Sequence, residues 1–156
     1  MLKKIKPYIV SVVIALGVGG LSAALTSQSM DIYSKINQPP LSPPSILFPI
    51  VWTILFTLMG IASYLVVTSN AGIKQQGSAL KFYALQLIFN FFWSIWFFNL
   101  QAYWFAFVWL VALLILIIAT TIKFWQISKL AGILLLPYIA WVTFAGYLNL
   151  AIALLN

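Results

Sequence analysis

Five apolar runs, each long enough to cross a bilayer, constrain the fold more than any other feature of this sequence. They cover approximately residues 8–26, 44–68, 78–98, 103–122 and 130–155. A helix of about 20 apolar residues spans the hydrocarbon core of a membrane. Backbone polar groups inside lipid must bond to one another, so such runs form helices. The sequence therefore predicts a single all-α membrane domain over residues 1–156, built as a bundle of five transmembrane helices.

The composition supports a membrane location and excludes several kinds of chemistry. Hydrophobic residues make up 64% of the chain, charged residues make up 6%, and the mean hydropathy is +1.09. Soluble domains carry about 25% charged residues. The chain has no His and no Cys, and Asp31 is its one acid. This excludes a zinc or iron–sulfur site, paired-carboxylate catalysis and a Ser/His/Asp triad. We therefore expect no metal, no resident cofactor and no conventional catalytic residue.

The positions of the eight lysines predict the orientation of the helices. Seven lysines lie at run ends that would share one side of the membrane, and only Lys35 lies on the other side. Basic residues accumulate on the cytoplasmic side, so we predict the N-terminus inside and the C-terminus outside. The lysines separate apolar runs and do not gather on one polar face. This distribution argues against nucleic-acid binding.

The first run leaves two alternatives open. Basic residues precede it and small residues follow, as in a cleaved signal peptide, although its length favours a retained helix. Small residues recur at every fourth position in two series, which are Ala15, Gly19 and Ala23, and Leu16, Gly20 and Ala24. Such spacing lets helices approach closely, either inside the bundle or across a dimer seam.

A proline-rich stretch precedes the second run. Four prolines within residues 37–44 fix φ and remove amide donors, so regular helix is not expected over residues 37–42. Ser42, which precedes a proline, is predicted to be the N-cap of the helix that follows. Trp52, Phe56 and Gly60 are spaced four apart and share one face of that helix. We therefore predict a rigid lid over an aromatic wall.

Indole and amide side chains share faces of the third and fifth predicted helices. The two sets are Gln86, Asn90, Trp93 and Phe97, and Tyr138, Trp141, Ala145, Leu148 and Asn149. Asn90 and Asn149 need polar partners, either across helices or in a ligand. Together with Trp52 the sets would enclose a cavity suited to a flat aromatic guest, although core packing also explains many of these rings. Trp104 and Trp125, beside turns, are typical of interfacial anchors.

Three stretches occur in a characteristic order over nearly the whole chain. They are NQPPLSPPSILFPIVWTILFTLMG, LIFNFFWSIWFF and PYIAWVTFAGYLNLAI. As a set they resemble the TspO/MBR family of tryptophan-rich sensory and translocator proteins. The resemblance implies a five-helix bundle, commonly a homodimer, with a ligand cavity closed by the first loop. It also implies binding of porphyrins such as protoporphyrin IX and of benzodiazepine-type drugs, with light-dependent porphyrin breakdown linked to bacterial members.

The resemblance also implies which residues bind the ligand. The family's motifs match Trp52, Asn90, Trp93, Trp141, Phe144, Ala145 and Asn149. Tyr33 and Pro43 would be neighbours on the lid, and Tyr138 shares the stripe of the fifth helix. In a light-driven reaction of bound porphyrin, Trp52 and Trp141 would be the catalytic indoles.

The resemblance leaves the function and the source partly open. Transport of tetrapyrroles or lipids is the alternative function, although no acid lies within an apolar run to couple it to ions. Animal members end the fifth helix with a Tyr followed by Lys or Arg for cholesterol, and this chain has neither after Asn149. We therefore predict a bacterial member in the cell membrane, with no high-affinity sterol site.

Overall fold

The computed structural model describes residues 2–26, 35–44 and 46–156, and side chains from Val10 onward except that of Thr26. Within these residues the chain forms five long helices and no strand, which confirms the predicted all-α class. The elements are α1 (Leu2–Thr26), α3 (Leu47–Val67), α4 (Ile73–Ser94), the π-helical turn η2 (Ile95–Asn99), α5 (Tyr103–Ile127), α6 (Lys129–Leu134) and α7 (Leu136–Leu155).

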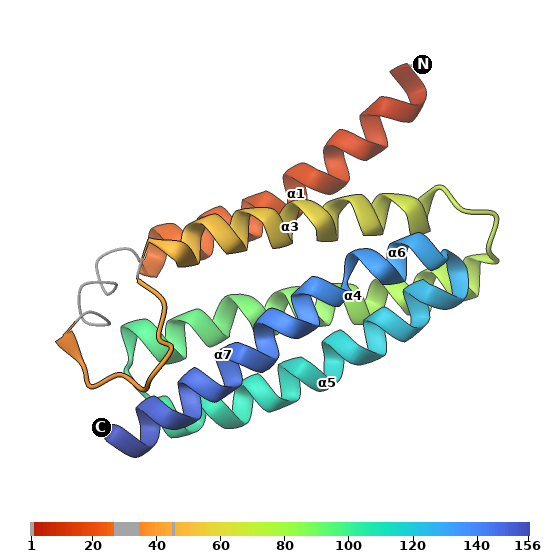
Figure 1. Ribbon diagram of the computed structural model, residues 1–156. Helices are drawn as coiled ribbons and strands as arrows, with labels where there is room; N and C mark the ends of the chain where they lie inside the picture. Colours follow the sequence, from red (N-terminus) through yellow and green to blue (C-terminus); the bar gives the residue numbers. More distant parts are fainter. Residues whose placement is uncertain (1, 27–34, 45) are drawn as a thin grey trace.

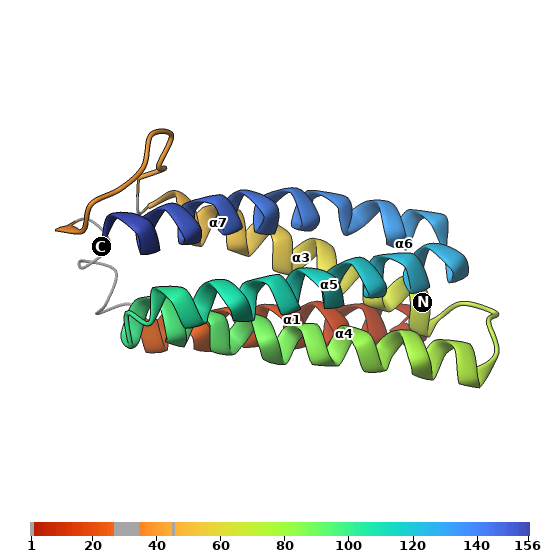
Figure 2. The same cartoon turned by 90° about the horizontal axis from the view of Figure 1, so that it is seen from below.

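The helices form a closed ring in which each packs on its two neighbours (Figures 1 and 2). Helix α1 contacts α3 and α4, α4 contacts α5, α5 contacts α6 and α7, and α6 returns to α3. The contact of α4 with α5 confirms that the short turn between them joins antiparallel neighbours. The N-terminus lies at the same end as the α3–α4 connection, and the proline-rich loop and the C-terminus lie at the other end (Figure 1).

The proline-rich loop is irregular as predicted, but the predicted N-cap is wrong. The Ser42 hydroxyl donates to the Pro39 carbonyl over 2.7 Å, and α3 begins only at Leu47. A residue that precedes a proline is disfavoured in the helical region, so the consecutive prolines 43 and 44 delay the helix. Leu41, in the same loop, has a φ of 71°, a left-handed conformation that is strained for a side chain of this kind.

The loop between α3 and α4 is shorter than predicted. The sequence predicts a loop up to Gly77, but α4 begins at Ile73. The Gln76 amide N–H donates to the Gly72 carbonyl over 2.9 Å, which starts the helix early. The Gln76 side chain also donates to the Ser69 carbonyl and hydroxyl, each over 3.0 Å. These bonds hold both ends of a tight turn.

The fifth apolar run is divided at Leu135, between α6 and α7. Pro137 lies at the start of α7, where its missing N–H is tolerated. Three described stretches are long and apolar enough to cross a membrane, and Val10–Leu25 is a shorter apolar stretch. The three stretches are Leu47–Val67, Tyr103–Ile127 and Lys129–Leu155.

Glycines set the close approach of α1 to α3. A Cβ atom on Gly60 would lie 2.6 Å from the Val12 Cα atom, and one on Gly19 would lie 2.5 Å from Cδ2 of Phe56. Ala15, from the same small-residue series as Gly19, is fully buried. Ala15 and Gly19 therefore pack inside the bundle, whereas Ala23 of the same series and the series Leu16, Gly20 and Ala24 are exposed.

Candidate functional site

A cavity of about 230 Å³ lies between α1, α3 and the continuous helix formed by α4 and η2. Its lining residues are Gly19, Ser22, Ala23, Phe48, Pro49, Trp52, Phe56, Asn90, Ser94 and Phe98. Aromatic rings form most of the walls, and small residues of α1 leave the space that the rings enclose. Ser22, Asn90 and Ser94 contribute the polar side chains. Of the described residues that line this cavity, none is ionisable.

A buried hydrogen-bonded chain fixes Asn90 at the cavity wall. Asn90 is 2% exposed, and its Nδ2 donates to the Tyr138 hydroxyl over 2.6 Å. That hydroxyl donates in turn to Oε1 of Gln86 over 2.6 Å, and Nε2 of Gln86 lies 3.8 Å from the Met59 sulfur. Because buried polar groups are expensive to leave unpaired, this chain orients the amide of Asn90.

A second polar cluster joins α4, α5 and α7 away from the cavity. The Trp93 indole N–H donates to Oδ1 of Asn149 over 3.0 Å, and Nδ2 of Asn149 donates to the Tyr103 carbonyl over 2.8 Å. Asn149 is completely buried. Trp93 also stacks on Phe97, with ring centroids 5.3 Å apart. These two predicted ligand-binding residues therefore bond to each other and hold three helices together.

Phe48 and Phe98 separate these two regions. Both rings line the cavity, and both also line a void of about 10 Å³ next to Trp93, Ala145 and Asn149. The two rings meet edge to face, with centroids 6.2 Å apart. The sequence predicts one cavity enclosed by all three helical stripes, but these rings fill its middle.

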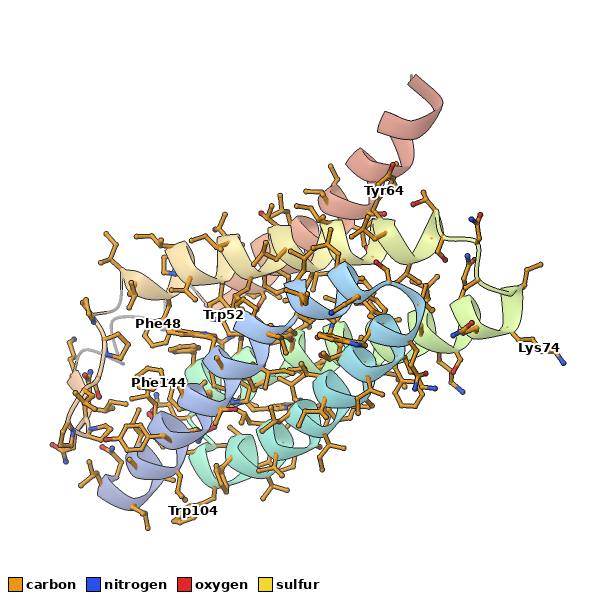
Figure 3. All side chains as sticks on the ribbon, turned by 45° about the vertical axis from the view of Figure 1, so that its right-hand side comes forward. Phe48, Trp52, Tyr64, Lys74, Trp104 and Phe144 are labelled. Atoms are coloured by element: carbon orange, nitrogen blue, oxygen red, sulfur yellow. The ribbon has the colours of Figure 1, made fainter. Side chains whose placement is uncertain are left out.

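Trp141 lies between α3 and α7. Its ring lies edge to face with Phe48 at 5.9 Å and with Trp52 at 6.4 Å, and it contacts Phe144 at 5.7 Å. Figure 3 shows the side chains of Phe48, Trp52 and Phe144 at the end of the bundle near the proline-rich loop. Trp141 and Phe144 also line an open groove of about 410 Å³ between α3 and α7. Among the described residues, none accepts a hydrogen bond from the buried indole N–H of Trp141.

The proline-rich loop is held against α7 at two points. The Tyr147 hydroxyl donates to the Pro40 carbonyl over 2.7 Å. The amide N–H of Asn37 donates to Oδ1 of Asn156 over 3.3 Å, and Nδ2 of Asn156 donates back to the Asn37 carbonyl over 3.0 Å. Pro43 is buried within the loop. The predicted lid residue Tyr33 lies outside the described residues.

Comparison with known proteins accounts for this arrangement. The sequence model of the TspO/MBR family matches residues 9–155. The chain belongs to the TspO/MBR family. It is 36% identical to a tryptophan-rich protein TspO of Chlorobaculum tepidum, over 100% of this chain and 99% of that protein. It is 37% identical to a tryptophan-rich protein TspO of Archaeoglobus fulgidus, over 95% of each chain. It is also 35% identical to a translocator protein of Ovis aries, over 75% of this chain and 70% of that protein.

Membership in the TspO/MBR family and the long apolar helices establish a multi-pass integral membrane protein, and bacterial proteins are among its similar relatives. The residues implied by the family motifs occupy different places in this structure. Trp52 and Asn90 line the larger cavity, and Tyr138 stands behind Asn90. The void beside the cavity is lined by Trp93, Ala145 and Asn149. The groove between α3 and α7 is lined by Trp141 and Phe144.

Sequence reasoning missed several residues that shape this TspO/MBR cavity. Phe48 and Phe98 fall outside the four-residue spacing that selected Trp52 and Trp93, although both lie in the quoted family stretches. Gly19 belongs to the small-residue series that the sequence assigned to helix packing. Its role at the cavity follows from the ring of Phe56, which lies against it. Only contacts between helices identify these residues.

This site can bind a ligand through complementary shape and ring stacking. Aromatic rings attract flat guests through area burial and edge-to-face or offset contacts. Asn90, Ser22 and Ser94 supply directional hydrogen bonds that can orient a guest. Acid–base catalysis requires an ionisable group within reach of the substrate, and the described lining offers indoles and amides instead.

Proposed function

We propose that this chain is a membrane receptor for flat hydrophobic ligands, namely porphyrins such as protoporphyrin IX and benzodiazepine-type drugs. One observation carries the proposal, which is the partly open cavity with aromatic walls and a few polar groups. Pockets of this kind bury most of a small ligand and use few polar contacts for orientation. The homology to translocator and tryptophan-rich sensory proteins supports the same class of function.

Trp52 and Asn90 have distinct roles in this proposal. Trp52 presents its ring to the cavity and packs against Phe56 at 5.7 Å and Tyr138 at 6.2 Å, so its orientation is fixed before a ligand arrives. Asn90 is held by Tyr138 and offers its amide to the ligand's polar edge. Preorganised groups lose little freedom on binding, which favours affinity.

We further propose five membrane spans with the N-terminus inside and the proline-rich loop as a lid on the outer side, and a homodimer as the assembly. Two observations support the topology. Lys74, in the first turn of α4, lies with the α3–α4 connection at the N-terminal end of the bundle (Figures 1 and 3). The loop bonds to α7 through Tyr147 and Asn156 at the opposite end, beside the cavity residue Phe48.

A fluorescence titration tests the receptor proposal. Protoporphyrin IX is added in the dark to the purified protein in lipid nanodiscs, and quenching of tryptophan emission is followed. We expect saturable quenching, and Trp52→Ala should weaken binding roughly thirtyfold, as for a central aromatic contact worth about 2 kcal/mol. Trp104, which is 55% exposed and outside the cavity lining, gives the matched control Trp104→Ala, which should keep the affinity. Quenching that does not saturate, or that both variants reduce equally, would contradict the proposal.

A light-driven oxidation of bound porphyrin by dioxygen is a second candidate. It is favoured by Trp52 and Trp141, two indoles whose centroids lie 6.4 Å apart, one of them in the cavity wall. Excited porphyrin would pass electrons to dioxygen, and the indoles would act as electron relays. Trp52→Phe combined with Trp141→Phe should keep binding but lose the light-dependent decrease in porphyrin absorbance. An unchanged rate of decrease would contradict a role for the indoles.

A further inference from the structure

Phe48 and Phe98 form a movable wall inside the bundle. They are 6% and 7% exposed, and their rings stand at 81° to each other. On one side lies the 230 Å³ cavity with Trp52 and Asn90, and on the other side lies the void of about 10 Å³. The wall consists of two side chains only, and side chains change rotamer far faster than helices rearrange.

The cavity as it stands is small for the larger of the proposed ligands. Sites for drug-sized molecules usually enclose about 300–1,000 Å³, whereas this cavity encloses about 230 Å³. A guest with one or two fused rings fits this space. A tetrapyrrole, with four pyrrole rings in one plane, does not fit unless the cavity grows toward the void and its neighbours Trp93 and Ala145.

Phe48 is the half of the wall that can move. It is the second residue of α3, and the first turn of a helix has fewer backbone hydrogen bonds than its interior. Phe98 lies in the π turn η2, whose backbone is held by a hydrogen bond from the Leu100 N–H to the Ile95 carbonyl over 3.0 Å. The ring of Phe48 also contacts Trp141, whose indole N–H is buried without a partner among the described residues. A ligand oxygen that reaches this N–H would remove an unfavourable unpaired donor.

We propose that Phe48 is a size-selective gate within the ligand site. Small aromatic guests bind with the ring of Phe48 in place. A tetrapyrrole binds only after this ring rotates out, which frees the volume of the ring itself and opens the cavity toward the void and toward the groove of about 410 Å³ beside Trp141. This inference rests on the proposed receptor function, and it assigns the choice between ligand classes to a single residue.

The energetic signature of such a gate is a difference between ligands. Apparent affinity falls with the fraction of protein in the binding-competent state, so a closed gate weakens binding of the large ligand alone. Replacing Phe48 by alanine removes the gate. We expect the association rate of protoporphyrin IX to rise about tenfold, while the affinity for a two-ring naphthol changes less than about threefold.

Paired ligands and a matched variant test the gate in the full chain in nanodiscs. Stopped-flow quenching reports protoporphyrin IX, and the fluorescence of naphthol reports the small guest. Phe105→Ala is the control, because it removes the same kind of ring at a side chain that is 52% exposed and outside the linings of the cavity and the void. It should not accelerate protoporphyrin IX. Phe48→Leu replaces the ring with a smaller apolar side chain and serves as the test if Phe48→Ala does not fold.

Each outcome decides the proposal. Faster association of protoporphyrin IX alone, in the Phe48 variants alone, supports the gate. Equal acceleration of both ligands, equal acceleration in Phe105→Ala, or no change would overturn the gate and leave the receptor function standing. A wild-type chain that binds neither ligand overturns the receptor function and the gate together, so the two failures are distinguishable.

Discussion

The bundle has two sides that contain similar residues and differ in the open space beside these residues. The cavity side comprises α1, α3 and Asn90 of α4, and the packed side comprises α5, α7 and Trp93, which lies on the same stripe of α4. On the packed side, Trp93 and Asn149 bond to protein groups within 3.0 Å. On the cavity side, Trp52 and Asn90 border open space, and Asn90 also bonds to the Tyr138 hydroxyl over 2.6 Å. Indoles and amides in a membrane helix can therefore bind ligand or join helices, and only the space around them distinguishes the roles.

The small residues explain the difference between the sides. On the cavity side, Gly19 and Ala23 of α1 face the rings of α3 and leave volume unfilled. On the packed side, Ala145 and Leu148 touch only the void of about 10 Å³. Interior packing normally leaves few voids larger than a water molecule, so the volume of the cavity is a specific feature when it is compared with the void beside Trp93. An open groove of about 410 Å³ also lies between α3 and α7.

Removal of the Asn149 amide should destabilise the packed side, and we expect it to have the largest effect on stability. Asn149→Leu keeps the size of the side chain but leaves the Trp93 indole N–H without its partner and removes the side-chain bond to the Tyr103 carbonyl. The unpaired buried indole donor and the lost second bond should together lower the free energy of unfolding by about 2–4 kcal/mol. Thermal unfolding in nanodiscs measures the loss, and Thr143→Val, on the exposed face of α7, should change it little. Full stability in Asn149→Leu would contradict the structural role.

Two glycines sharpen the comparison, because each contacts a different kind of neighbour. Gly60→Ala would press a Cβ atom on the backbone of Val12, which cannot shift, and should lower stability by about 1–3 kcal/mol. Gly19→Ala would press on the ring of Phe56, which can move into the cavity. We expect this variant to lose less stability but to bind protoporphyrin IX about tenfold more weakly.

Gly20→Ala is the matched control for both glycines. Nothing lies within 4 Å of a Cβ atom at Gly20, so the substitution should stabilise α1 by about 0.5–1 kcal/mol through helix propensity and leave binding unchanged. Calorimetry and the fluorescence titration measure the two quantities. A loss of binding in Gly20→Ala equal to that in Gly19→Ala would show that the effect does not come from the cavity.

The loop contact should give the smallest effect on stability and a clear effect on exchange. Tyr147→Phe removes the hydrogen bond to the Pro40 carbonyl and should change the free energy of unfolding by about 0.5–1 kcal/mol. If the loop is a lid, loss of this bond destabilises its closed state, so the same variant should release protoporphyrin IX severalfold faster. Stopped-flow displacement measures the release rate. An unchanged rate would leave the loop as a structural strap.

The sequence predicts the helical fold well because the hydropathy and length of each apolar run specify a helix without reference to the other runs. Helix ends depend on local chemistry that is harder to rank. The prolines at 43 and 44 delay α3 to Leu47, although Ser42 carries the usual N-cap signal. Gly72 starts α4 within what composition marks as a loop. In both cases one backbone constraint outweighs the average character of the segment.

The site was predictable in its residue types but not in its connectivity. Periodicity placed Asn90 with Trp93, and Trp141 with Asn149, on the faces they occupy. It could not show that Trp93 and Asn149 bond to each other, because that bond depends on how α4 and α7 meet. Phe48 escaped notice for the same reason. Its place between cavity and void depends on contacts with Phe98 and Trp141.

The π turn η2 acts on the molecule as a one-residue insertion. Its bond from the Leu100 N–H to the Ile95 carbonyl encloses one residue more than an α-helical turn, and it lets the neighbours Phe97 and Phe98 both face inward. Deleting one residue there would return the turn to α-helical bonding and change the positions of Phe97 and Phe98 beside the cavity. When relatives of this chain are aligned, the number of residues in this segment is therefore as informative as their identities.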